Sequence, residues 1–397
     1  MSLGSLNLDP GWSKNRQLID LLGASLLGAI GSLPLHLAPL VISALITSTP
    51  VSLHAAGLIV SAAMIGQLCS ASLLPMLGIA HVGRTSALTA AFVMCVGVLI
   101  SSLPYYHLVA LGWFLIGLAC GVFRYLSALS ASAFPKRHFA FVFRLSVVLI
   151  LVSVVFYLLM FFGSTTSYKA FAWNLELILA VMLVLGLLLY RPLTEQALPA
   201  MQSHSPHRGT AHPQILGLIV IMAFFVGQVG FLSYVVQLGL KRGFEANDVI
   251  MALTAMKFIA GIWLLCIILR RRHGDQGTHL LGAALALIAA IASIYYGQGR
   301  VLFFGGLLVL EIALNMMSAR LQATVVVLNS RVGGKWITIA VLGGAAIGAP
   351  LNGLAISTGH AGGFVVFTIA TILAALLWKQ FFANVLIARK LEAETRS

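Results

Sequence analysis

The chain has 397 residues, of which 60% are hydrophobic and only 9% are charged. Soluble globular proteins carry roughly 25% charged residues, so this composition excludes an ordinary soluble protein and indicates an integral membrane protein. The formal net charge of +14 would suit a nucleic-acid-binding protein. Most of the basic residues, however, lie in short loops between apolar runs, where they determine membrane topology, so we expect no binding of nucleic acid.

Apolar runs bounded by charges and turn residues predict twelve membrane-spanning helices. The first six cover residues 18–47, 55–79, 86–103, 107–131, 139–163 and 170–190, and the last six cover residues 214–239, 247–270, 279–297, 301–325, 335–358 and 362–386. The longest polar stretch, residues 191–213, is rich in Pro, His and Ser and separates the two sets as a linker. We therefore predict an all-α polytopic membrane protein with two six-helix halves, residues 1–190 and 214–386, and a tail at residues 387–397.

The distribution of basic residues predicts the orientation of these helices. With an even number of spans, both termini lie on the same side of the membrane. Of the 24 basic residues, sixteen fall on that side, four fall on the other, and the remaining four lie inside the spans. Because Lys and Arg are concentrated in cytoplasmic loops, we expect both termini and the linker to be cytoplasmic, in a multi-pass protein of the cell (inner) membrane.

Three short segments carry a family resemblance. The loop after the second span reads MLGIAHVGR, the fourth span contains WFLIGLACG, and the eleventh contains GGAAIGAPLNG. With twelve spans in two halves and a central linker, the chain resembles the major facilitator superfamily. The resemblance implies two pseudo-symmetric halves, related as repeats, that move a solute by alternating access around a central site. It gives no subfamily, because the fifth span lacks the glycine-rich signature of that family's drug/proton antiporters.

The loop between the second and third spans keeps part of the pattern G-x-x-x-D-R-x-G-R that the resemblance implies. Gly83 and Arg84 stand at its last two signature positions, so the resemblance assigns them to a gating loop. The positions of the expected Gly, Asp and Arg hold Met76, Ala80 and His81. In the fourth span, Trp113 stands at the family's usual arginine. The gating pattern is therefore incomplete.

The tenth span carries Glu311, Asn315 and Arg320 within an otherwise apolar run. A charge at the bilayer centre costs about 2.5–3.5 kcal/mol on insertion scales, so it usually faces a partner or a water-filled cavity. Glu311 and Lys257 each lie ten residues below the outer start of their spans, which is about 15 Å at helical rise. We therefore predict a Glu311–Lys257 ion pair, which serves either in substrate binding and proton coupling or as a structural link between two helices.

Two arginines and a histidine inside spans could also contact a solute. Arg124 and Arg320 lie at roughly corresponding depths of the fourth and tenth spans. If both face one cavity, their guanidinium groups favour a carboxylate or phosphate; alternatively, either one snorkels to the cytoplasmic interface. His36 lies between Pro34 and Pro39, which remove backbone donors and can open the first helix. It could shuttle protons near neutral pH or form an ordinary hydrogen bond within the bundle.

Three amides inside spans, Gln228, Asn315 and Asn352, could orient a ligand or link helices by hydrogen bonds. The four cysteines lie in apolar spans without the spacing of a disulfide or a metal site, so we expect neither a metal nor a cofactor. The chain also has no G-x-x-x-x-G-K-[ST] loop and no H-E-x-x-H or G-x-S-x-G motif. These absences argue against an ATP-driven pump and against an enzyme.

The sequence therefore predicts a monomeric secondary active transporter that couples the movement of a small organic solute to protons. Among the deeper charges, Arg124, Lys257 and Arg320 outnumber Glu311, which favours an anionic or zwitterionic solute. An exporter of lipophilic drugs or metabolites is one alternative. Another is a transport-incompetent sensor or assembly protein with the same fold, which the incomplete gating pattern favours.

Overall fold

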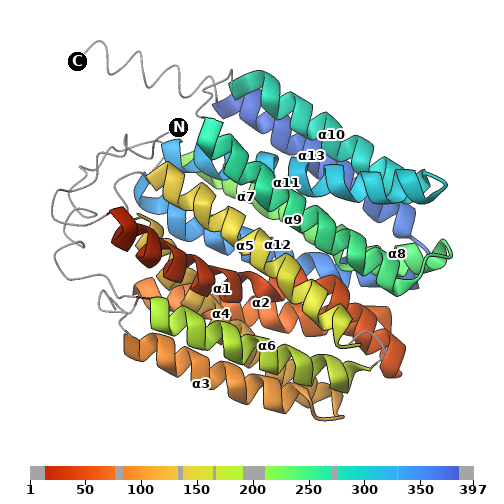
Figure 1. Ribbon diagram of the computed structural model, residues 1–397. Coiled ribbons are helices and arrows are strands. Elements are labelled where there is room, and N and C mark those ends of the chain that lie inside the picture. Colours follow the sequence, from red (N-terminus) through yellow and green to blue (C-terminus); the bar gives the residue numbers. More distant parts are fainter. Residues whose placement is uncertain are drawn as a thin grey trace.

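The computed structural model of the chain describes residues 14–76, 84–132, 137–163, 167–190, 211–270, 276–328 and 330–383 (Figure 1). Every regular element in these ranges is a helix. The elements are α1 (Lys14–Ser48), α2 (Leu53–Met76), α3 (Arg84–Ser101), α4 (Tyr106–Ser132), α5 (Arg137–Phe161), α6 (Tyr168–Leu189), α7 (Ala211–Ser233), α8 (Val235–Lys241), α9 (Ala246–Arg270), α10 (Gln276–Tyr296), α11 (Arg300–Leu328), α12 (Ser330–Ser357), α13 (Ala361–Leu377) and the π-helical segment η4 (Trp378–Ala383). Gly83, residues 191–210 of the predicted linker and the predicted tail lie outside the described residues.

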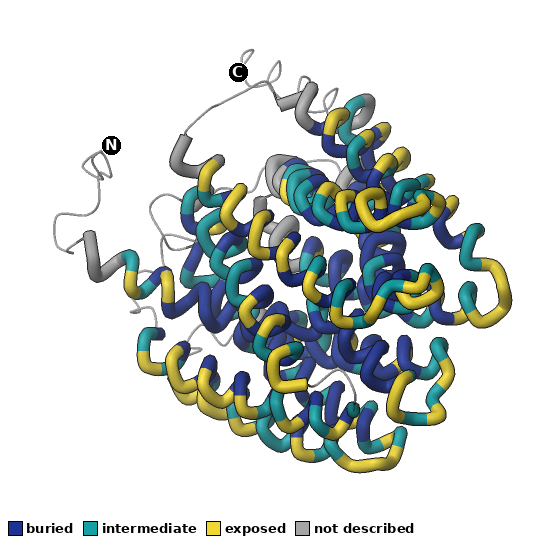
Figure 2. Tube along the Cα trace, turned by 45° about the vertical axis from the view of Figure 1, so that its right-hand side comes forward, coloured by how far each residue is buried: buried dark blue, intermediate teal, exposed yellow. Residues whose placement is uncertain are grey.

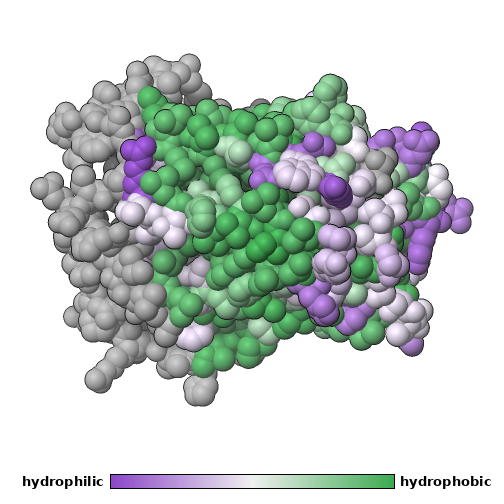
Figure 3. Space-filling model, turned by 90° about the horizontal axis from the view of Figure 1, so that it is seen from below, coloured by the Kyte–Doolittle hydropathy of each residue, from purple (hydrophilic) through white to green (hydrophobic). Residues whose placement is uncertain are grey.

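The predicted spans correspond to the long helices. Among the described residues, eleven helices are long and apolar enough to cross a membrane. The ninth predicted span corresponds to α10, whose described apolar stretch, Leu280–Tyr296, is shorter. Figure 2 shows that buried residues gather along the middle of the bundle, while the peripheral helices are exposed on their outward sides. Exposed side chains there include the large apolar Phe92, Val184 and Leu188. They contribute to an apolar surface of the kind that a lipid bilayer covers, and Figure 3 shows such a band on one face, next to a polar rim.

The seventh predicted span is not one continuous helix. The sequence predicts a single span over residues 214–239, whereas α7 ends at Ser233 and the short α8 begins at Val235. Tyr234 between them has φ −112° and ψ 12°, and its hydroxyl donates a hydrogen bond to the carbonyl oxygen of Leu53 on α2 at 2.8 Å. An apolar run reveals neither this break nor the contact with a distant helix that accompanies it.

The first and last groups of helices lie on opposite sides of the bundle. In Figure 1, α3 and α6 lie along one side and α10 and α13 along the opposite side, with α1, α2, α5, α9 and α12 between them. Across this middle region α2 packs against α12 and α5 packs against α9. We call the end of the bundle at which α1 begins the N-terminal end, and the end at which α2 begins the distal end.

The distal end is closed by contacts between α2 and α12. His54 Nδ1 lies 3.1 Å from the carbonyl oxygen of Pro350, and the Ser61 hydroxyl donates to the carbonyl oxygen of Ala346. A β-carbon on Gly57 would lie 2.9 Å from the carbonyl oxygen of Ala349, so the two backbones approach closely only because Gly57 has no side chain. Such small-residue contacts allow helices to pack tightly in a membrane.

The packing of α2 on α4 depends on glycine in the same way, which gives a first prediction. A β-carbon on Gly117 would collide with the backbone oxygen of Ala63. Gly117→Ala should therefore force the two helices apart and destabilise the fold by about 1–3 kcal/mol, the usual cost of overpacking. Thermal unfolding of the purified protein measures this effect. Gly305→Ala is the matched control, because a β-carbon there meets nothing within 4 Å; an equal loss of stability in both variants would contradict the prediction.

Candidate functional site

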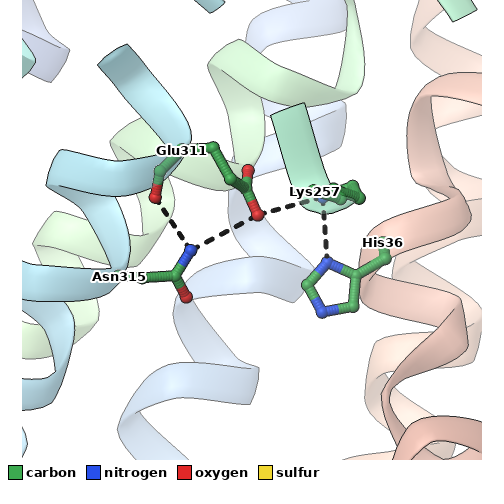
Figure 4. Close-up of polar contacts among 4 residues, drawn as sticks. All are labelled: His36, Lys257, Glu311 and Asn315. Carbon is green, nitrogen blue, oxygen red and sulfur yellow. Dashed lines mark hydrogen bonds and ion pairs between the residues drawn. The ribbon is translucent and has the colours of Figure 1, made fainter. Parts of the chain in front are cut away.

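At the centre of the bundle a lysine and a glutamate form an ion pair. Lys257 lies on α9 and Glu311 on the neighbouring α11, and only 3% and 2% of their respective surfaces are exposed. Lys257 Nζ lies 3.2 Å from Glu311 Oε1 (Figure 4). The ion pair predicted from the depth of the two residues is therefore formed. Its role in binding or coupling stays a prediction.

His36 extends this pair to a helix of the first group. Its Nδ1 lies 3.3 Å from Lys257 Nζ (Figure 4). An ammonium group can only donate, so Nδ1 must be unprotonated in this contact. The hydrogen bond thus links α1 to α9 through the interior of the bundle. The opening of the helix at Pro34 and Pro39 is not found, because α1 runs as one helix through both prolines and is packed by neighbouring helices.

Asn315 and Phe156 complete the surroundings of the ion pair. Asn315 Nδ2 donates to the backbone oxygen of Glu311 at 2.8 Å and lies 3.4 Å from Oε1 of the same residue. The ring centroid of Phe156, on α5, lies 5.8 Å from Lys257 Nζ, which is within the range of a cation–π interaction. The second carboxylate oxygen, Glu311 Oε2, is buried and has no hydrogen-bond partner among the described residues. Within the cluster, Oε2 is therefore the oxygen that is available to bind a proton.

This cluster joins an ion pair on one side of the molecule to an imidazole on the other. Lys257 contacts a carboxylate on its own side and an imidazole on the other, with an aromatic face beside it. Taking charges out of water is costly unless they are paired, so any change in the charge of Glu311 alters what Lys257 must contact. Protonation of Glu311 can therefore change the contacts between α1 and α9.

The two predicted arginines do not occupy equivalent places. Arg124, on α4, packs beside Gly31 of α1, and its Nη1 is buried without a hydrogen-bond partner in the described part of the chain. Arg320, on α11, is close enough to Lys379 of η4 to interact with it electrostatically. It also has another partner in the structure. Arg124 therefore adjoins the centre of α1, while Arg320 lies near the end of α13.

The remaining predicted residues lie in three different environments. Asn352 Nδ2 donates to the backbone oxygen of Gly230 at 2.8 Å, so this amide links α12 to α7. Gln228 is fully buried, and neither of its amide atoms has a hydrogen-bond partner among the described residues. Arg84 is the exposed first residue of α3. Of the predicted set, the structure brings His36, Lys257, Glu311 and Asn315 together.

The sequence analysis missed two residues that the structure places beside these groups. Phe156 lies in the uncharged run VSVVFYLLMFF, where nothing distinguishes it from a lipid-facing side chain. Arg144 was not included among the candidates, yet its Nε is buried against Gly28 of α1. The signal that could have identified it is its position inside the apolar fifth span.

No protein-family model matches the chain, and no curated protein sequence matches it. Solved structures do match over nearly its whole length. The human organic anion transporter MFSD10 has a TM-score of 0.68 at 17% identity and covers 93% of this chain and 100% of its own. The E. coli xylose transporter XylE, in a partially occluded inward-open conformation, has a TM-score of 0.72 at 16% identity and covers 93% of this chain and 98% of its own.

A third match, the transporter FucP in an outward conformation, has a TM-score of 0.60 at 14% identity and covers 94% of this chain and 99% of its own. FucP is described as a major facilitator superfamily transporter. These identities are too low to transfer a substrate or a subfamily, but the coverage extends over both groups of helices. The chain therefore has the major facilitator fold, as its resemblance to that superfamily predicts.

Proposed function

We propose that this chain is a secondary active transporter that moves a small organic solute across the cell membrane by alternating access. The observation that carries the proposal is the Lys257–His36 hydrogen bond, which joins the two groups of helices at the bundle centre. In transporters built from two repeats, the halves rock about a site near the bilayer midplane, and contacts between halves at that site change during the cycle. The fold shared with an organic anion transporter and a proton-coupled xylose symporter supports this function.

Glu311 is the proposed coupling group. Without a proton, its carboxylate holds Lys257 at 3.2 Å. With a proton, the carboxyl loses its negative charge, and Lys257 is left without a counter-ion in a buried site. The ammonium then becomes available to an anionic or zwitterionic solute. Proton binding and solute binding would in this way depend on each other.

The contacts between α2 and α12 suggest which state of the cycle this is. They close the distal end of the bundle, and two of the matching XylE structures are inward-open forms, with TM-scores of 0.70 and 0.72. With both termini in the cytoplasm, as the basic residues predict, the distal end faces outward. The structure then corresponds to an inward-facing state.

The function is tested by uptake into proteoliposomes of labelled carboxylates, amino acids, sugars and lipophilic cations, with and without an imposed pH gradient. We expect one anionic or zwitterionic class to accumulate only with the gradient, and a protonophore to abolish accumulation. Flux of lipophilic cations alone would replace this proposal with a drug exporter. Binding without flux for every class would instead support a sensor with the same fold.

A further inference from the structure

A second group of polar side chains converges where α1, α4 and α5 meet. Gly28 and Gly31 of α1 have no side chains, and groups from the other two helices occupy the space. A β-carbon on Gly28 would collide with Ser127 Oγ of α4 and lie 2.9 Å from Arg144 Nε of α5. A β-carbon on Gly31 would lie 2.6 Å from the backbone nitrogen of Arg124. The two arginines therefore meet α1 one helical turn apart.

These groups present hydrogen-bond donors without acceptors. Arg124 Nη1, Arg144 Nε and Ser127 Oγ are buried atoms with no hydrogen-bond partner among the described residues. Neither arginine forms an ion pair with any residue that the structure describes. Arg124 instead lies close enough to Arg144 for the two like charges to repel. Guanidinium groups only donate hydrogen bonds, so the cluster is satisfied by an anion that accepts them.

We infer that Arg124 and Arg144, with the Ser127 hydroxyl, bind the carboxylate or phosphate group of the transported solute. The inference rests on the proposed transport function and adds to it the class of the solute and the place of its anionic group. Planar guanidinium groups match these oxyanions in bidentate geometry. Both arginines are half-buried as whole residues, and Arg124 Nη1 and Arg144 Nε are buried.

The position of this site connects it to the Lys257 cluster. His36 follows Gly31 by five residues on α1, which is about 7.5 Å along the helix axis. Arg124 is close enough to His36 to interact with it electrostatically. An anion held by the arginines therefore lies on the N-terminal side of His36. Its charge stabilises the same cationic region that Glu311 stabilises when it is deprotonated.

The test measures binding of succinate, inorganic phosphate and glucose to the purified full-length protein at equal ionic strength, by thermal stabilisation and by affinity. We expect at least one anion to stabilise the protein, since binding to the folded state raises the unfolding temperature, and glucose to have no effect. Arg144→Gln should weaken anion binding by about tenfold or more, the equivalent of one charge-assisted hydrogen bond. Arg144→Lys should restore only part of the anion affinity, because lysine lacks the planar, forked guanidinium group.

Three further variants separate a loss of binding from a loss of folding. Arg300→Gln removes an exposed arginine at the start of α11 and should leave anion affinity unchanged. Gly28→Ala keeps every charge but displaces Ser127 Oγ and Arg144 Nε. It should therefore weaken anion binding as Arg144→Gln does. Gly305→Ala, where a β-carbon meets nothing within 4 Å, should not. Stabilisation by neither anion, or unchanged affinity in Arg144→Gln, would overturn the inference.

A lipid phosphate has the same chemistry as a soluble phosphate, so the experiment is repeated with phosphatidylglycerol. Stabilisation through Arg144 by the lipid alone would identify a lipid site and overturn the inference. Flux in proteoliposomes separates this inference from the transport proposal. Anion binding that depends on Arg144 but produces no flux would refute transport and leave the anion site standing. Flux of a neutral solute that is unchanged in Arg144→Gln would refute the anion site and leave transport standing.

Discussion

Glu311→Gln is expected to abolish solute accumulation driven by a pH gradient while leaving exchange of solute across the membrane measurable. Glutamine keeps the size of the side chain and can still accept from Lys257, but it cannot gain or lose a proton. With one proton per solute, a gradient of one pH unit supports about a tenfold concentration ratio, since about 1.4 kcal/mol corresponds to a factor of ten. In the variant, the inside and outside concentrations should become equal.

Proteoliposomes loaded with unlabelled solute provide the exchange measurement, and an imposed pH gradient provides the accumulation measurement. Glu176→Gln is the matched control, because this acid lies inside α6 on the periphery of the bundle, away from Lys257. Its accumulation should remain at the wild-type ratio. A Glu311→Gln variant that still accumulates solute tenfold would remove this carboxylate from the coupling mechanism.

The sequence predicts the depth of a residue in the membrane better than the direction of its side chain. Counting residues from the start of each span placed Lys257 and Glu311 at the same level, and the structure joins them at 3.2 Å. The same counting treated Arg124 and Arg320 as equivalents, but one packs against α1 and the other lies near Lys379. In a helix that is apolar all round, no hydrophobic periodicity shows which face meets a neighbour.

Contacts between distant helices were the least predictable part of the fold and of the site. From the sequence, His36 could form a hydrogen bond anywhere within the bundle, and only the packing of α1 near α9 gives it Lys257 as a partner. At the break between α7 and α8, Tyr234 likewise donates a hydrogen bond to Leu53, which lies 181 residues earlier in the chain. Composition and apolar length predicted where the long helices lie, because the bilayer requires a minimum apolar length of each segment separately.

Lys257→Met is expected to destabilise the protein by about 3–5 kcal/mol, because it leaves the buried carboxylate of Glu311 without its ion-pair partner. The double variant Lys257→Met/Glu311→Leu should recover most of that stability, since apolar side chains of similar volume replace buried ion pairs at little cost. Thermal unfolding in detergent measures both. The exposed pair Arg300–Asp248, at 3.6 Å, is the control: Arg300→Met should cost no more than about 1 kcal/mol.

Transport by the double variant decides between the two roles that the sequence leaves open for this pair. If the pair only locks α9 to α11, restoring stability should also restore accumulation driven by the pH gradient. If Glu311 carries the proton and Lys257 meets the solute, the double variant should fold well and still fail to accumulate solute, because both groups are gone. We expect stability without coupled transport, since Lys257 also contacts His36 of the opposite group of helices, a contact that a lock between α9 and α11 does not need.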